Sequence, residues 1–492
     1  MYSTLLIWLL ALPAAAGLVC RGLKSPRAIL AFVTGGMAVI SVLAFRAAGQ
    51  VFCAKASGPA GQWLALDALS AFHLVLMMTV YLLCSIFAWI YFEEEIRKGR
   101  CDLRLTRKFG SLWYWALTSM MLVLLSNNIG IMWVGIEAST LMTAFLICIH
   151  ITPASLEATW KYLVVCSVGV AFAFMGTLLV GAAAAKVAPE SANLLNWSHL
   201  VDIAPSLSPA LMKLAFLFLL VGYGTKVGLA PMHSWLPDAH SQAPAPVSAL
   251  FSGFLLNTAL YCIMRFIPLV QAATGHSGWA LGILVVFGGL SILLASAFIT
   301  GQRDIKRLLA YSSVEHLGII TLGLGLGGIG TFAALFHTMN HSLCKPLAFF
   351  SAGRLGQIRG SHEIQKLAGS FQSSGPWALA LVASLFALGG MVPSPIFFSE
   401  FMVGFAAVDH HRIGVLVLLL VGLAIVFLGL SRCAITIAWG HPESATEKVR
   451  PHGLEVLFVA VVLAAILVLG FWMPTPLKEW ITAAAAVIGG AP

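Results

Sequence analysis

Apolar runs long enough to cross a lipid bilayer recur along almost the whole chain, and they constrain its fold more than any other feature. The hydrocarbon core of a bilayer is about 30 Å thick, which needs roughly 20 apolar helical residues. Of the 492 residues 60% are hydrophobic and only 10% are charged, whereas soluble domains carry about 25% charged residues. The sequence therefore predicts an integral membrane protein with no soluble domain between its spans.

The runs are continuously apolar, which favours helices, because the strands of a membrane barrel alternate apolar and polar residues. We therefore expect an all-α integral membrane fold of about fourteen transmembrane helices. The first run is expected to be a retained helix, since no basic segment precedes it as in a signal peptide. The expected spans are residues 3–20, 28–48, 64–93, 112–126, 128–150, 160–185, 208–230, 243–267, 279–299, 308–326, 328–352, 374–408, 412–434 and 453–474.

Basic residues gather in alternate loops, so the net charge of +9 is a signal of topology and predicts no nucleic-acid partner. Two clusters are the clearest, and they consist of Arg97, Lys98, Arg100, Arg104, Arg107 and Lys108, and of Arg303, Lys306 and Arg307. Loops rich in lysine and arginine stay in the cytoplasm. This rule predicts that the odd-numbered loops are cytoplasmic and that both termini face outside.

Two of the expected spans are interrupted by glycine and proline. The interruptions fall in Leu220–His240 and in Ala387–Phe401, and each brackets one charged residue, Lys226 and Glu400. Paired broken helices at corresponding positions indicate a transporter core of inverted repeats. We therefore expect two inverted five-helix repeats. The predicted divisions are 1–108 for helices 1–3, 109–270 for the first repeat, 271–440 for the second, and 441–492 for helix 14 with a short tail.

Ionisable residues within the spans need a reason, because each costs roughly 2.5–3.5 kcal/mol at membrane depth. Glu137 lies in the middle of an apolar run, and it is either a proton-loading site or half of a structural ion pair, with Lys161 as a candidate partner. Lys226 suits a proton relay, since a buried lysine can give up its proton, and the alternative is a lysine that extends to the interface.

Three polar residues follow Lys226, namely His233, Asp238 and His240. They fit a proton uptake or release route, or an interfacial polar cap.

A second polar set lies in the later spans. His337, His341 and Lys345 stand four residues apart, so they share one face of a helix. Histidine there suits a proton shuttle, while a metal site is the alternative, although no carboxylate or thiolate with ligand spacing accompanies the histidines. Glu315 and His316 add a polar step, beside serines that could simply allow close helix packing.

Glu137, Lys226, Lys345 and Glu400 alternate acid, base, base and acid along the chain. Such an order can pass protons by electrostatic coupling, since charging one member shifts the proton affinity of its neighbour. The nine cysteines form no C-x-x-C pair and mostly lie in apolar runs, which argues against iron–sulfur, zinc and disulfide frameworks. We expect no cofactor and no catalytic centre in this chain.

At these residues the sequence resembles a known family. The segments GTKVGLAPMHSWLPDAHSQAPAPVS (224–248), RDIKRLLAYSSVEHLG (303–318) and HTMNHSLCKPLAFF (337–350) are similar to the antiporter-like membrane subunits of respiratory complex I, multi-subunit Na⁺/H⁺ antiporters and energy-converting membrane hydrogenases. The sequence around Glu137, Asn257 and Glu400 most resembles the F component of hydrogenase-4-type, formate-hydrogenlyase-related complexes.

The resemblance implies a proton pathway through Glu137, Lys226, Lys345 and Glu400, with Lys161 as the partner of Glu137. Asn257 stands where many members have a lysine, so the middle of the pathway would rely on water or histidines. The family resemblance also implies a bacterial or archaeal cytoplasmic (inner) membrane.

The resemblance further implies two kinds of partner. They are other membrane subunits and a peripheral redox arm made of nickel–iron hydrogenase and iron–sulfur subunits. The chain would then be a non-catalytic subunit of an oxidoreductase complex that moves protons, or Na⁺, across the lipid bilayer. Two alternatives stay open: a Na⁺/H⁺ antiporter subunit without a redox partner, and a non-pumping membrane anchor.

Overall fold

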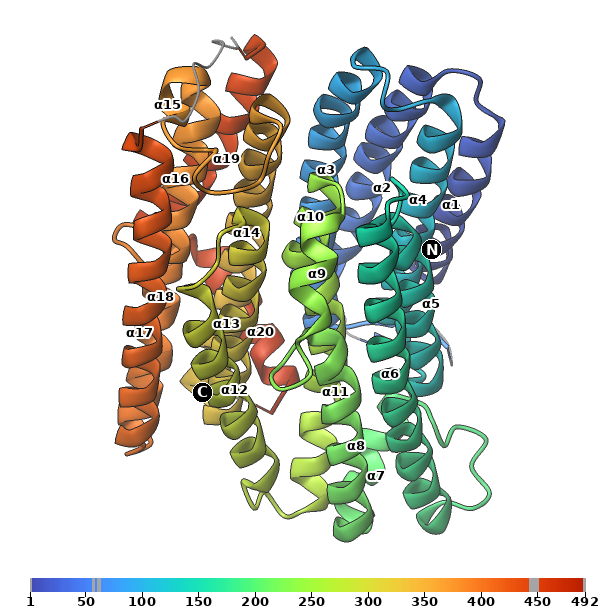
Figure 1. Cartoon of the computed structure of the whole chain (residues 1–492). Helices are drawn as coiled ribbons and strands as arrows, with labels where there is room; N and C mark the ends of the chain where they lie inside the picture. The colour runs from blue at the N-terminus through green and yellow to red at the C-terminus, as the bar shows by residue number, and fades with distance from the viewer. Residues whose placement is uncertain (1, 55–57, 60–62, 442–450, 490–492) are drawn as a thin grey trace. The chain divides into compact units, whose positions relative to one another are not determined.

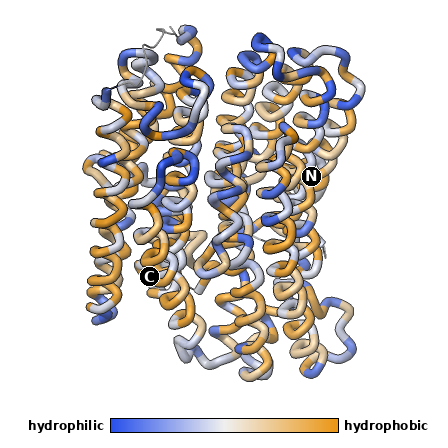
Figure 2. The backbone as a smooth tube through the Cα atoms, viewed as in Figure 1, coloured by the Kyte–Doolittle hydropathy of each residue, from blue (hydrophilic) through white to orange (hydrophobic). Residues whose placement is uncertain are grey.

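The computed structural model describes residues 2–54, 58–59, 63–441 and 451–489, and most of them are helical (Figure 1). The chain forms two compact units, each described here by itself. Unit 1 comprises the described residues within Met1–Gly228, Phe254–Ile283 and Glu479–Pro492, and unit 2 comprises those within Leu229–Gly253 and Leu284–Lys478. Apolar residues dominate the helices, while polar residues concentrate at their ends and in the loops (Figure 2).

Unit 1 contains nine of the labelled α-helices in full. They are α1 (Tyr2–Gly22), α2 (Pro26–Ala54), α3 (Ala68–Arg97), α4 (Leu103–Leu125), α5 (Ile129–Ile147), α6 (Pro153–Val187), α7 (Trp197–Ile203), α8 (Pro209–Val227) and α11 (Leu256–Ala273). A short antiparallel pair, β1 (Gly58–Pro59) and β2 (Ala65–Leu66), precedes α3, and a 3₁₀ turn, Ala204–Ser206, follows α7. The most extensive helix packing is between α6 and α8.

Unit 2 is built around α13 (Ile305–Leu326) and α14 (Ile329–Arg359), which pack against each other. The other helices are α9 (Trp235–Gln242), α10 (Ala245–Leu250), α15 (Ser370–Ser373), α16 (Gly375–Leu388), α17 (Pro395–Asp409), α18 (Ile413–Trp439) and α19 (Gly453–Phe471). The chain passes between the units within α12 (Trp279–Ile299), within α20 (Thr475–Val487) and within a π-helix, Phe251–Leu255.

Twelve helices of the described part are long and apolar enough to cross a membrane. The all-α membrane fold is therefore confirmed. Two further predicted spans coincide with α14 and with the pair α16 and α17, whose members have 14 and 15 residues. The count of about fourteen and the two inverted repeats, with their boundaries, stay predictions.

Polar caps explain where several helices begin earlier or later than their apolar runs. Asp67 accepts the backbone N–H of Ser70, so α3 begins at residue 68 and not at 64. Thr152 in the same way accepts the backbone N–H of Ser155, so α6 begins at residue 153 and not at 160. Asp102 caps α4, whose first turns carry basic residues, so this helix begins at 103 and not at 112.

The first predicted break is confirmed between α8 and α9. α8 ends at Val227 because Gly228 adopts φ +84°, a left-handed conformation that costs glycine little. The interrupted backbone keeps its hydrogen bonds: Gly228 N–H donates to Gly224 O (3.0 Å), and Ala230 N–H donates to Ser291 Oγ (3.0 Å). A break inside the membrane is tolerated where its polar groups are satisfied in this way.

The second break is confirmed between α16 and α17. Gly390 has φ +72°, and Ser394 caps α17 by accepting the N–H of Phe397 at 3.3 Å. Met391 N–H donates to Phe386 O (3.0 Å), which satisfies part of the interrupted backbone. A third irregularity, the π-helix Phe251–Leu255, was not predicted, because its sequence, FSGFL, carries no proline.

Gly222 belongs to the glycine-rich stretch Leu220–His240, but it lies inside α8 and not at the break. A Cβ at Gly222 would come within 2.4 Å of the Ala173 backbone nitrogen of α6. The missing side chain lets α6 and α8 approach closely, as small residues commonly do in membrane helices. This approach places the side chains of α6 beside the end of α8.

Candidate functional site

Lys226 lies in the last turn of α8 and is completely buried. Its Nζ donates to Thr140 Oγ1 of α5 at 3.0 Å and to the Tyr162 hydroxyl of α6. The Tyr162 hydroxyl is also hydrogen-bonded to Thr143 Oγ1, at 2.6 Å. Lys226 therefore does not extend to the interface, and its ammonium is held by uncharged hydroxyls.

Glu137 lies on α5 one turn from Thr140, and its carboxylate interacts electrostatically with Lys226. Its Oε2 is buried and has no hydrogen-bond partner among the residues that the structure describes. We call Glu137, Thr140, Tyr162 and Lys226 the Lys226 group. It joins the half-buried carboxylate of Glu137 and the buried amine of Lys226.

Lys161 forms an ion pair within its own helix. Its Nζ lies 2.7 Å from Glu157 Oε1, one turn earlier on α6, and the two side chains are 49% and 67% exposed. Lys226 interacts electrostatically with Glu137. The pairing of Lys161 with Glu137 stays a prediction.

Unit 2 holds a second buried set, which we call the Lys345 group: Glu315, His316, His337, His341, Lys345 and Glu400. The first five residues are completely buried and Glu400 is 6% exposed. His316 Nδ1 and His337 Nε2 are 3.0 Å apart, and the rings of His316 and His341 have centroids 5.4 Å apart. The predicted stripe of α14 thus faces the polar step of α13.

The carboxylates of the Lys345 group have few hydrogen bonds. Neither oxygen of Glu315 has a hydrogen-bond partner in the described part of the chain, and Oε2 lies 3.7 Å from His316 Nε2. Lys345 interacts electrostatically with Glu315, while its Nζ donates to the Leu309 carbonyl at 2.9 Å. A buried carboxylate without donors needs a proton or a nearby cation to compensate its charge.

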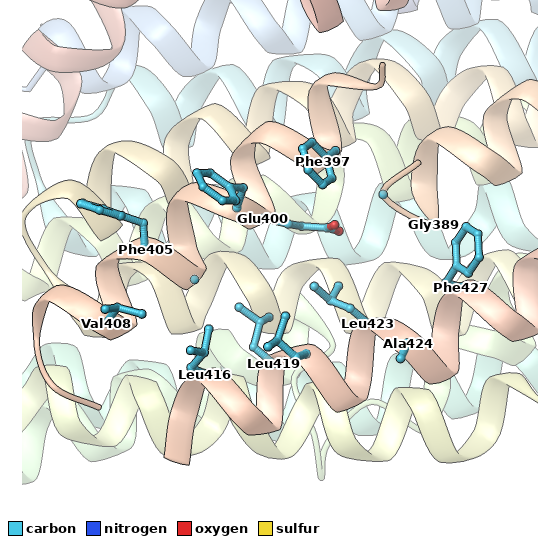
Figure 3. Close-up of a pocket in the computed structure, with 14 residues that line it drawn as sticks. Gly389, Phe397, Glu400, Phe405, Val408, Leu416, Leu419, Leu423, Ala424 and Phe427 are labelled. Carbon is cyan, nitrogen blue, oxygen red and sulfur yellow. The ribbon is translucent and has the colours of Figure 1, made fainter. Parts of the chain in front are cut away.

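Glu400 of α17 reaches this group through the second break. A Cβ on Gly390 would lie 2.3 Å from Glu400 Oε2, so only glycine leaves room for the carboxylate. Figure 3 shows the Glu400 side chain directed toward Gly389 at the wall of a cavity of about 570 Å³, otherwise lined by apolar residues of α17 and α18. The break therefore positions Glu400 as well as interrupting the helix.

The residues after the first break divide between the two interpretations proposed for them. Asp238 forms an ion pair with Arg307, which fits a polar cap. His240 is completely buried, stacks on Phe349 with 5.0 Å between ring centroids, and interacts electrostatically with Lys345. His233 is 9% exposed and packs against two aromatic rings.

Asn257 is completely buried in α11, in unit 1, as is Lys226. An asparagine here supplies hydrogen-bonding atoms without a charge. Its part in ion movement stays a prediction, as do the roles of all the residues named above.

Sequence reasoning missed several residues that these groups depend on. Ser399 Oγ is hydrogen-bonded to His337 Nδ1 at 2.9 Å, which orients the ring so that Nε2 meets His316. Tyr162 and Thr140 hold Lys226 as described above. The position of Thr140, one turn from Glu137, could have indicated that it contacts the charged residues. A tyrosine or serine in an apolar run gave no such indication.

Lys306 was assigned to a cytoplasmic loop, but it is buried, with 2% of its surface exposed. Its Nζ donates to the carbonyls of Ser241, in the last turn of α9, and of Ala243, which directly follows α9. Lys306 is therefore part of the buried interior of unit 2 and not of a solvated loop.

A metal ion could be held by His316, His337 and Glu400, whose ligand atoms lie within 4.8 Å of one another. A carboxylate therefore does accompany the histidines, contrary to the expectation from spacing, because folding brings Glu400 to them from a distant part of the chain. The same three side chains can equally carry a proton, since His316 and His337 already lie at hydrogen-bond distance.

Membrane helices, two helix breaks and buried ionisable groups define an integral membrane protein with charged groups inside its helical units. Residues 126–427 match the family described as "NADH:quinone oxidoreductase/Mrp antiporter, TM". The chain is 36% identical to the hydrogenase-4 component F homolog of Methylacidiphilum infernorum over 434 residues, 88% of this chain and 90% of that protein. The chain therefore belongs to the NADH:quinone oxidoreductase/Mrp antiporter membrane family, and it is an antiporter-like membrane subunit.

Two further likenesses agree with this assignment. Hydrogenase-4 component B of Escherichia coli (strain K12) is 29% identical over 439 residues, 83% of this chain and 63% of that protein. A chain of the membrane-bound sulfane sulfur reductase, an archaeal respiratory membrane complex, has the same fold, with a TM-score of 0.88 at 24% identity over 99% of this chain and 98% of that chain.

Proposed function

We propose that this chain translocates protons across the membrane as a subunit of a redox-driven complex. The observation that carries the proposal is the Lys345 group, in which acidic, imidazole and amine groups are all buried among helices of unit 2. Nothing in apolar packing requires such groups, and each is costly unless it is used or paired.

The contacts within unit 2 suit stepwise proton transfer. A proton taken up at Nε2 of His316 is balanced by one released from Nδ1 to His337, at 3.0 Å. Glu315 lies beside Nε2, and Lys345 interacts with it electrostatically. Charging Lys345 therefore favours the ionised form of Glu315, and this coupling is what a relay needs.

In unit 1, the Lys226 group has the composition of a second proton-exchange site. The ammonium is held by hydroxyls that can also accept or donate after the proton leaves. Glu137 supplies the opposite charge nearby. Loss of the proton from Lys226 would leave this carboxylate without its cation.

The proposed partners are other membrane subunits and a peripheral redox arm of nickel–iron hydrogenase and iron–sulfur subunits. The names of two relatives, hydrogenase-4 components F and B, support this choice. Redox chemistry would take place in that arm, with no cofactor in this chain. We further propose the bacterial or archaeal cytoplasmic (inner) membrane, with both termini outside.

A second candidate is a subunit of a multi-subunit Na⁺/H⁺ antiporter without a redox partner, which the family description also covers. A third is a non-pumping anchor, for which the uncharged Asn257 gives some support. The buried lysines of both groups and the buried carboxylates of the Lys345 group oppose the third candidate.

The test is to isolate the native complex through a tag on this chain, identify its subunits, and measure proton flux after reconstitution in vesicles. We expect hydrogenase and iron–sulfur subunits, and flux that Glu315→Gln reduces strongly. Copurified antiporter subunits alone would instead support the second candidate. Normal flux in Glu315→Gln would remove the Lys345 group from the pathway.

A further inference from the structure

We propose that a basic pocket of unit 1 binds the headgroup of an anionic phospholipid. The pocket encloses about 400 Å³ where the end of α1, the start of α4 and the end of α5 meet. α4 packs against both of the other helices. Its polar lining is Arg21, Arg107, Lys108 and Ser111, and no aspartate or glutamate lines it.

The cations of this pocket differ from their neighbours in having no acidic partner. Four other basic residues of the same loops pair with glutamates of α3, namely Arg27, Arg97, Lys98 and Arg100. No ion pair is formed by Arg21, Arg107 or Lys108 within the described ranges. Three cations around one cavity therefore lack a counter-charge from the protein, and an anion from outside would supply it.

The pocket is held in shape without a ligand. The Arg21 guanidinium lies 4.7 Å above the Trp115 ring, and the indole N–H donates to the Ala14 carbonyl at 3.2 Å. A Cβ on Gly17 would lie 2.4 Å from the same indole nitrogen, so glycine lets Trp115 pack against α1. Arg107 is fixed by a hydrogen bond from Nε to the Leu23 carbonyl, at 2.8 Å.

Ser111 is an independent sign that a ligand belongs here. Its side chain is buried, with 2% exposed, and it lines the cavity. Its Oγ has no hydrogen-bond partner in the part of the chain that the structure describes. An orphaned buried hydroxyl is unfavourable, and a phosphate oxygen among the three cations would accept its hydrogen bond.

A lipid fits this pocket better than a free phosphate ion, because the remaining wall is apolar. Leu112, Met142 and Phe145 complete the lining, and Phe145 is 49% exposed. Leu18 and Leu141, on the two flanking helices, are also exposed. Acyl chains can lie along these faces, while the basic end would lie at the cytoplasmic leaflet in the predicted topology, where anionic lipids attract lysine and arginine.

The experiment is native mass spectrometry of the full-length chain in detergent, titrated with dioleoyl phosphatidylglycerol or dioleoyl phosphatidylcholine. The test variant is the double substitution Arg21→Gln, Lys108→Gln. Its matched control is Lys24→Gln, Arg104→Gln, which removes two exposed cations of the same loops that do not line the pocket. Each cation near an anionic headgroup is worth a factor of about five, so the test variant should bind phosphatidylglycerol about 30-fold more weakly.

The proposal requires that the control stays within twofold of the unmodified chain and that phosphatidylcholine binds more weakly than phosphatidylglycerol. Equal losses in both double variants, equal binding of the two lipids, or displacement of the lipid by millimolar inorganic phosphate would each overturn it. If the double variant does not fold, Lys108→Gln is compared with the control Lys24→Gln. Lys108→Gln should then bind phosphatidylglycerol about fivefold more weakly.

Discussion

Replacing Lys226 by methionine should slow proton movement strongly, while the hydroxyls around the lysine keep other hydrogen bonds. Methionine has a similar length, so it leaves little empty space. The two hydroxyls that hold the ammonium keep other partners: Thr140 Oγ1 donates to the Ile136 carbonyl (3.1 Å), and the Tyr162 hydroxyl bonds to Thr143 Oγ1 (2.6 Å). No buried hydroxyl loses its last hydrogen bond.

Both the stability and the transport activity should be lower in this variant. Removing one member of a buried charge pair costs about 3–5 kcal/mol because the other charge is left uncompensated, and Glu137 loses its cation here, so the free energy of unfolding should fall. Proton flux should fall, since a proton at this depth would no longer have an acceptor. A charge there costs about 2.5–3.5 kcal/mol, which corresponds to a roughly 70- to 400-fold slower flux.

Flux is measured with a pH-sensitive dye in vesicles that contain the reconstituted complex, under an imposed membrane potential. Thermal unfolding in detergent reports stability. Lys213→Met is the matched control, because Lys213 also lies on α8 but is partly exposed, with its ammonium 5.6 Å from the Trp279 ring. Flux within twofold of the unmodified protein in Lys226→Met would refute the assignment of Lys226, and an equal loss in the control would show a nonspecific effect of charge.

Three further substitutions test other parts of the groups. Gly390→Ala should lower the free energy of unfolding by about 1–2 kcal/mol, because residue 390 has a left-handed backbone, and it should displace the Glu400 carboxylate. Proton flux should therefore fall more than in the control Gly389→Ala, because φ of Gly389 is negative. His337→Ala removes the contacts to His316 and Ser399, and it should lower the vesicle flux at least tenfold, with a smaller loss in His341→Ala; unmodified rates in both would exclude a histidine route. Asn257→Lys adds a buried cation to unit 1, so it should lower the melting temperature without raising flux, and a gain in flux would show that a lysine can serve there.

The sequence was sufficient to locate the charges and the helix breaks, because both are expensive in a bilayer. A lysine or glutamate inside an apolar run stands out by its cost, and glycine with proline marks a helix end by steric rules alone. Lys226, Lys345 and Glu400 were therefore predictable one by one. The stripe of His337, His341 and Lys345 was predictable as well, since residues four apart share a helix face.

Contacts between helices could not be predicted in the same way. Helical spacing gives neighbours on one helix, whereas the contact of His316 with His337 and the packing of Glu400 against Gly390 depend on how separate helices pack. The ion pair of Lys161 with Glu157 is a different case, because residues four apart on one helix are neighbours and helical spacing is enough to predict their contact. Helix ends were missed where a capping residue outside the apolar run extended the helix, as Thr152 does.

The two breaks carry charges of opposite sign, and the helix ends account for part of this difference. Lys226 lies in the last turn of α8, where the unpaired carbonyls favour a cation. Glu400 lies in the second turn of α17, nearer to the end that favours an anion. The dipole weakens beyond the first turn, so for Glu400 the space left by Gly390 is the larger factor. A lysine at position 400 would then have the wrong sign for this end of α17 and would need more room than that space allows, so the break favours a carboxylate over an amine.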